Sequence, residues 1–259
     1  MVARSISLMN MVDEYNISDE TILNIFYDVL NSQNISIYND KLEQLFIFAM
    51  ERKELFTNIR VTVDKPSNDI AYEYIEKLVS AYIKDRQNDK LSNPLKNYGE
   101  KDEALISRVR ASTGASEDVV QLFIDGHYLF MSAENMNGAI LEQYLADVLE
   151  PCGWLWCAGS IYRAIDFCYF GQDEIVLLQV KNKYNTENSS SSAIRIGTKI
   201  IKWNRLNRPR QETGLDRPLP NWESLQQIVN IPHINHLLTE ESYLEYIERY
   251  STNELDTLL

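Results

Sequence analysis

The feature that most constrains the fold is a change in the spacing of apolar residues near Gly153. Before it, apolar residues recur at intervals of three and four, which predicts helices that each pack by one face. After it, they alternate or run continuously over short stretches, which predicts strands. A chain with this order favours an α/β fold, in which helices flank a mixed β-sheet.

Three amphipathic helices are predicted early in the chain. Ser18 has the side chain of an N-cap and is followed by an acidic first turn, so a helix is expected over 18–33. Apolar residues at helical spacing predict two more helices, over 39–56 and 67–86. The polar stretch 87–103 predicts a loop or hinge. We therefore expect a helical N-terminal region over 1–110 and an α/β core over 111–259.

The core is predicted to begin with helices and to continue with three strands. One or two short helices are expected after residue 104, and Ser132 is the predicted N-cap of a further helix over 133–149. Pro151 and Gly153 then end the helical pattern. Strands are predicted over 154–160, 161–170 and 174–183, with a tight turn joining the last two into an antiparallel hairpin.

The register of this hairpin brings polar side chains together. If Gly171 pairs with Glu174, then Asp166 lies opposite Gln179 on the same face. Lys181 follows Gln179 by two positions and therefore shares that face. Cross-strand neighbours lie about 5 Å apart at Cβ. An acid, an amide and a lysine are thus expected to converge at one end of the sheet.

These residue types suit the hydrolysis of a phosphodiester, which needs an oxygen-lined site for a hard cation such as Mg²⁺. Asp166 can supply a carboxylate and Gln179 a carbonyl oxygen as metal ligands. Lys181 can orient the attacking water or stabilise the developing charge. Glu142 lies at the border of the apolar stripe of helix 133–149, and is predicted to supply a further acid to the metal and to catalysis.

Charge is distributed unevenly along the chain. The net charge of −13 opposes nonspecific binding of nucleic acid by the whole surface. Residues 178–210, however, hold eight Lys or Arg and one acid, which predicts a local anion site. A solvated linker rich in Ser and Asn is the alternative reading. Within the expected DNA-recognition segment, 182–210, the predicted DNA-binding residues are Lys183, Asn185, Asn188, Ser190, Arg195, Lys199, Lys202 and Arg205.

Two levels of family resemblance follow from these motifs. The aspartate of AIDF followed by LLQVK resembles the PD-(D/E)xK nuclease superfamily, in the variant where Gln replaces the second acid. Over roughly residues 128–225, the segments MSAEN, GWLWCAGSIYRAIDF and LLQVKNKYNTENSSSSAIRIGTKIIKW resemble the SinI family of type II restriction endonucleases. Ile165 stands where the motif name has proline, and Gln179 removes one motif acid, which makes a helix acid such as Glu142 more necessary.

The resemblance implies a restriction-endonuclease-like core and a Mg²⁺-dependent enzyme. Such an enzyme cuts both strands of double-stranded DNA at a short palindrome, GGWCC for proteins similar to SinI, where W is A or T. A homodimer and a cognate methyltransferase that protects host DNA are implied in the same way. The helical region over 1–110 is then expected to serve dimerisation or to embrace the DNA. Asp166, Gln179 and Lys181 take the motif positions.

Other functions remain open from the residues alone. One is a structure- or modification-dependent DNA repair nuclease, and another is a non-catalytic DNA-binding module on the same fold. A third is a plain α/β protein in which Asp166 and Lys181 form a buried ion pair. No apolar run approaches about 18 residues, so no membrane partner is expected. Three cysteines and the absence of a signal-like N-terminus favour the cytoplasm.

Overall fold

The computed structural model describes residues 2–33, 37–95, 102–172, 174–184, 198–209 and 218–251. The chain forms two compact units. The first contains Met1–Asn88 and Ala146–Asn221, and the second contains Asp89–Leu145 and Trp222–Leu259. Each unit thus combines segments that are distant along the chain. The functional boundary placed near residue 110 stays a prediction.

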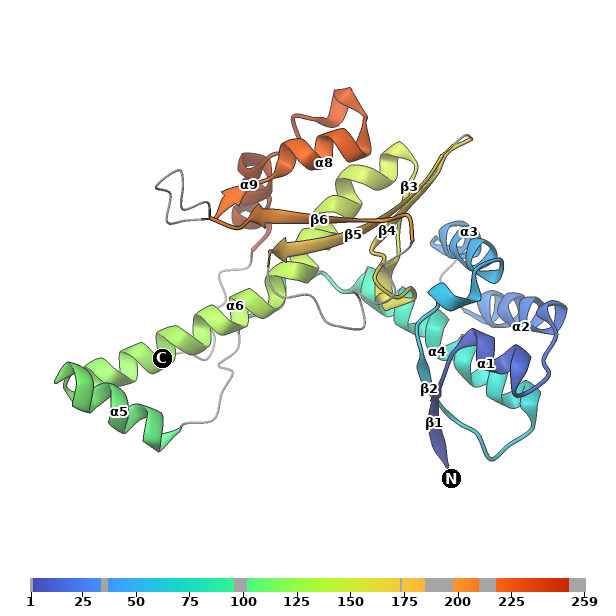
Figure 1. Ribbon diagram of the computed structural model, residues 1–259, viewed down its shortest axis with the longest axis horizontal. Coiled ribbons are helices and arrows are strands. Elements are labelled where there is room, and N and C mark those ends of the chain that lie inside the picture. The colour runs from blue at the N-terminus through green and yellow to red at the C-terminus, as the bar shows by residue number, and fades with distance from the viewer. Residues whose placement is uncertain are drawn as a thin grey trace. The chain divides into compact units, whose positions relative to one another are not determined.

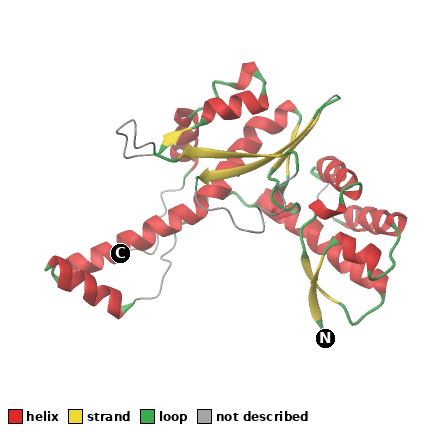
Figure 2. Ribbon diagram, in the orientation of Figure 1, coloured by secondary structure: helices red, strands yellow, loops and turns green. Residues whose placement is uncertain are grey.

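Helices fill the N-terminal part of the first unit: α1 (Leu8–Asp13), α2 (Asp19–Ser32), α3 (Asn39–Met50) and α4 (Ser67–Gln87). The three helices predicted from periodicity are confirmed as α2, α3 and α4. Ser18 caps α2 as expected, since its hydroxyl accepts the Thr21 N–H at 3.1 Å. A short antiparallel ribbon of β1 (Ala3–Ile6) and β2 (Ile59–Thr62) was not predicted and stands apart from the main sheet (Figure 2).

The second half of the first unit carries a five-stranded sheet in the order β3-β4-β5-β6-β7 (Figure 1). Its strands are β3 (Trp154–Trp156), β4 (Phe167–Phe170), β5 (Ile175–Lys183), β6 (Ile200–Asn207) and β7 (Leu219–Pro220). The β5–β6 pair is parallel and the other pairs are antiparallel. The predicted mixed sheet with an antiparallel hairpin is therefore confirmed, and β5, buried from Val176 to Val180, runs through its middle.

The hairpin register is the one predicted. Phe167 pairs with Leu178, and Gly171 donates its N–H to the Glu174 carbonyl at 2.9 Å. The regular pairing ends at Phe167 and Leu178, because Asp166 also donates its N–H to the Leu178 carbonyl, at 2.8 Å. The direct pairing of Asp166 with Gln179 stays a prediction. The strand expected from residue 161 instead begins at Phe167. Ala164 has a φ of 59°, in the left-handed region, which interrupts the extended backbone that alternation alone predicted.

The polar segment 182–210 is not a loop throughout. Residues 200–207 form β6, in which Ile200 and Trp203 are buried. The basic residues obscured this strand, although its apolar residues are the β-branched and aromatic types that strands favour. Residues 185–197, which include four of the eight predicted DNA-binding residues, lie outside the described part of the chain.

A buried ion cluster, here called the Glu150 cluster, joins helices to the start of the sheet. Both carboxylate oxygens of Glu150 accept bonds from Arg86, at 2.6 and 2.7 Å, and Lys41 adds a bond at 2.5 Å. The N–H of Trp156 also donates to this carboxylate, at 3.2 Å. Burial opposes ionisation, but the bonds from Arg86 and Lys41 outweigh it and lower the pKa of Glu150. The cluster therefore ties α3 and α4 to β3.

The second unit is helical, with α5 (Glu103–Thr113), α6 (Glu117–Leu149), α8 (Trp222–Val229) and α9 (Glu240–Tyr250). The prediction that Ser132 starts a helix is wrong, because it is fully buried in the middle of α6. N-cap preference is a local signal, and the helix continues where packing supports it. Among the described residues, no helix combines the length and hydropathy that a bilayer crossing requires.

Candidate active site

Asp166 sits directly before β4 and is partly buried. Its main-chain N–H donates to the Leu178 carbonyl at 2.8 Å, and its Oδ2 accepts the Val180 N–H at 2.7 Å. The carboxylate thus serves as an acceptor for β5 just where β4 begins. Because a carboxylate offers about four acceptor positions, this one bond leaves capacity for a cation.

Burial raises the pKa of the Asp166 carboxyl to about 6, from an ordinary value of 3.8. The Val180 N–H and the charge of Lys181 act in the opposite direction, but they do not offset the loss of hydration. A carboxyl group with this pKa keeps its proton until near pH 6. A cation that binds beside it stabilises the ionised carboxylate.

Gln179 follows Leu178 on β5 and is 1% exposed. Leu178 is paired with Phe167, the residue after Asp166. The Oε1 of Gln179 has no hydrogen-bond partner within the described part of the chain. A buried acceptor left unpaired costs about 1–3 kcal/mol, so it requires an explanation, and a bound ligand is one. A carboxylate and an amide oxygen on neighbouring strands fit a hard divalent cation, which prefers oxygen ligands.

Lys181 is exposed near the end of β5 and shares the face of Gln179. Its charge lowers the pKa of Asp166, which is consistent with their closeness. The structure therefore places Gln179 and Lys181 on one face of β5, and Asp166 beside this strand, bonded to the Val180 N–H. Their chemical roles stay predictions.

Glu142 is partly buried on α6, in the portion that belongs to the second unit. Its role as a further metal ligand stays a prediction. Among the residues that the structure describes, no three His, Cys, Asp or Glu side chains gather as at a metal site.

Four of the eight predicted DNA-binding residues are described: Lys183, Lys199, Lys202 and Arg205. Asn185, Asn188, Ser190 and Arg195 lie outside the described residues. Lys202 is aligned with Gln179 in the parallel β5–β6 register, and so shares the face of the site. Arg205 lies on the opposite face, is 8% exposed and donates its Nε–H to Asn182 Oδ1 at 2.8 Å.

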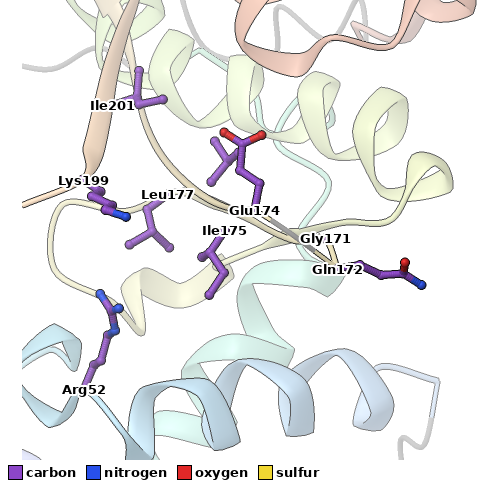
Figure 3. Close-up of a pocket in the computed structure, with 9 residues that line it drawn as sticks. Arg52, Gly171, Gln172, Glu174, Ile175, Leu177, Lys199 and Ile201 are labelled. Atoms are coloured by element: carbon purple, nitrogen blue, oxygen red, sulfur yellow. The ribbon is translucent and has the colours of Figure 1, made fainter.

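Lys199 instead borders a cavity of about 470 Å³ at the other end of β5. The side chains of Arg52 and Lys199 both extend toward the space beside Leu177 (Figure 3). None of Asp166, Gln179 and Lys181 lines this cavity; its lining residues are Arg52, Gly171, Gln172, Glu174, Ile175, Val176, Leu177, Lys199 and Ile201. The cavity and the site at the end of the strand are therefore separate features.

One polar residue beside the site was missed from the sequence. Asn204 of β6 is aligned with Lys181 of β5, and its Oδ1 is buried without a partner among the described residues. The missed signal was the alternation of residues 200–206, which would have placed Lys202 and Asn204 on one face of a strand.

A mixed sheet flanked by helices, with an amide and a lysine on one strand and an acid beside it, is consistent with the restriction-endonuclease-like fold. The SinI restriction endonuclease family model matches residues 63–253, and the chain belongs to this family. The type II restriction enzyme SinI of Salmonella infantis is 31% identical over 232 residues, which cover 79% of this chain and 96% of that protein. The type II restriction enzyme Eco47I of Escherichia coli is 32% identical over 226 residues, 85% of this chain and 92% of that protein. The predicted family is confirmed.

Proposed function

We propose that the chain is a type II restriction endonuclease that hydrolyses both strands of double-stranded DNA at GGWCC in the presence of Mg²⁺. The observation that carries this proposal is the buried, unpaired Oε1 of Gln179. Gln179 shares a face of β5 with Lys181 and directly precedes Val180, whose N–H binds the Asp166 carboxylate. Membership of the SinI family supports the reaction class and the choice of palindrome.

Asp166 and Gln179 would hold the cation through a carboxylate and an amide oxygen, and Glu142 is proposed as a further acid. Bound Mg²⁺ would polarise the phosphoryl group and lower the pKa of a coordinated water. Lys181, as an ammonium beside this pair, would orient the attacking water and stabilise the charge that develops on the phosphoryl oxygens.

Lys183, Lys199 and Lys202 are proposed to contact DNA phosphates. Asn185, Asn188, Ser190 and Arg195 have side chains that can read base edges. Arg205 is proposed to act less directly, because it is buried on the opposite face. A palindromic target implies a two-fold symmetric homodimer. Cleavage of DNA inside the cell implies a cytoplasmic enzyme and a cognate methyltransferase that protects the host DNA.

The test is digestion of a plasmid that contains GGWCC sites. In Mg²⁺, the wild type is expected to give discrete fragments whose sequenced ends map to GGWCC. Lys181→Ala is expected to lower the cleavage rate by about 10³-fold or more, the usual loss when a transition-state charge contact is removed. The matched control is Lys84→Ala, which removes an exposed lysine of α4 and should cut normally. Ca²⁺ should support DNA binding without cleavage.

Each alternative predicts another outcome. Smears or damage-dependent nicks would indicate a repair nuclease. Binding without cutting, unchanged by Lys181→Ala, would indicate a non-catalytic module. A fully active Lys181→Ala protein would rule out the proposed mechanism.

A further inference from the structure

The β5–β6 pair places a second unpaired amide oxygen next to the proposed site. Lys181 and Asn204 are direct partners in the parallel register, so their side chains leave the sheet on the same face. Asn204 Oδ1 is buried and has no hydrogen-bond partner among the described residues, as is the case for Gln179 Oε1.

The backbone of Asn204 is held from outside the β5 pairing as well. Its main-chain carbonyl accepts a bond from Asn221 Nδ2 at 3.2 Å. Asn221 in turn donates its N–H to the Arg205 carbonyl at 2.8 Å, and its own carbonyl accepts Trp203 Nε1–H at 2.9 Å. Because Asn221 bonds to three consecutive residues of β6, the strand presents Oδ1 from a fixed position.

The position of this oxygen suits Lys181 better than a cation held by Asp166. Lys181 is on the neighbouring strand, where aligned side chains start about 5 Å apart. Asp166 lies before β4, two strands from β6 and offset along the sheet, so a cation bound to its carboxylate is too distant for Asn204. Lys181 offers three N–H donors and is exposed, whereas Asn204 Oδ1 is a buried acceptor.

We propose that Asn204 is a positioning residue, whose Oδ1 accepts a hydrogen bond from Lys181 Nζ in the DNA-bound enzyme. The inference rests on the proposed function. When a cation occupies the oxygens of Asp166 and Gln179, those lone pairs are no longer directed at Lys181. Asn204 is then the aligned neighbour that holds the ammonium beside the phosphate rather than free in solvent.

Two variants and a control test this role. Asn204→Leu removes the acceptor at similar size, and Asn204→Asp keeps an acceptor there. Asn235→Leu is the control, because Asn235 has the same kind of buried, unpaired Oδ1 but belongs to the second unit. Single-turnover cleavage in Mg²⁺ and DNA affinity in Ca²⁺ are measured for all three.

Asn204→Leu is expected to slow cleavage about 10- to 100-fold, the value of one hydrogen bond to a charged group, with DNA affinity within about two-fold of the wild type. Asn204→Asp should recover most of the rate, and Asn235→Leu should cut normally.

A second readout does not depend on cleavage. NMR relaxation of the Lys181 ammonium in the Ca²⁺–DNA complex should show it restrained in the wild type and mobile in Asn204→Leu. Wild-type cleavage by Asn204→Leu, equal losses in the Leu and Asp variants, or an equally mobile Lys181 in both proteins would overturn the inference. Failure of the wild type to cut at GGWCC in Mg²⁺ would overturn the proposed function instead.

Discussion

Two polar clusters in the first unit differ in how their buried oxygens are satisfied. In the Glu150 cluster, both oxygens of the carboxylate bond to cations that the chain itself supplies. In the second cluster, here called the Asp166 cluster (Asp166, Gln179, Lys181 and Asn204), two buried amide oxygens lack partners among the described residues. The unpaired atom of the Glu150 cluster is a donor, Arg86 Nε, so that cluster has no acceptor left for a cation.

This difference supports the proposal that a ligand completes the Asp166 cluster, whereas the Glu150 cluster is a closed structural network. A buried charge is tolerated when it is paired and hydrogen-bonded, as Glu150 is. An unpaired buried acceptor costs about 1–3 kcal/mol, and two of them on one sheet face lower stability unless a ligand completes them. Buried polar groups without partners depart from the usual rule that such groups are hydrogen-bonded, and departures of this kind are expected at functional sites.

Removing Glu150 should have the largest effect on folding. Glu150→Ala leaves Arg86 buried without its carboxylate, so we expect the free energy of unfolding to fall by about 3–5 kcal/mol. Urea denaturation measures the change. The control is Glu14→Ala, which removes a carboxylate from an exposed pair with Arg4 and should leave the unfolding curve essentially unchanged. A small effect of Glu150→Ala would mean that the two clusters do not differ as described.

The raised pKa of Asp166 predicts an intermediate effect that depends on pH. Between about pH 4 and pH 6, the native carboxyl keeps a proton that the unfolded chain has lost. The unfolded state then binds fewer protons, so the free energy of unfolding should fall as pH rises through this window, by about 2–3 kcal/mol in total. Asp166→Asn should remove this slope.

Urea denaturation with EDTA at several pH values measures this slope in both proteins. Mg²⁺ should stabilise the wild type only as pH rises above about 6, because the cation needs the ionised carboxylate. The same slope in Asp166→Asn would show that another group is responsible.

The sequence predicted the hairpin well, because local rules decide it. The turn after Gly171 fixed the register from Phe167 to Ile175. Two predictions that were wrong, an N-cap at Ser132 and a strand from residue 161, depended on local signals that tertiary structure overrides. Ser132 is buried within a long helix, and Ala164 adopts a left-handed backbone.

Asn204 could not be found in the same way. Its relation to Lys181 arises from parallel pairing between strands separated by residues 184–199, and no turn rule sets the register of such a pair. The unpaired state of an oxygen is also a property of packing, which the order of residues does not reveal. Periodicity could have predicted that residues 200–207 form a strand, but not that this strand pairs with β5.

Gln179→Leu should have the smallest effect on folding and gives the sharpest contrast between the clusters. Leucine fills similar space without an unpaired acceptor, so without metal the free energy of unfolding should stay the same or rise by up to about 1 kcal/mol. Mg²⁺ should stabilise the wild type but not the variant, and the variant should not cut DNA.

The matched control is Gln143→Leu, since Gln143 accepts the Lys90 N–H at 2.7 Å and donates to Asp89 at 3.1 Å. That change breaks two made bonds and should destabilise the protein by about 1–2 kcal/mol. If both leucine variants lost similar stability, the Gln179 amide would be an ordinary satisfied core group, and the argument for a cation beside Asp166 would lose its main support.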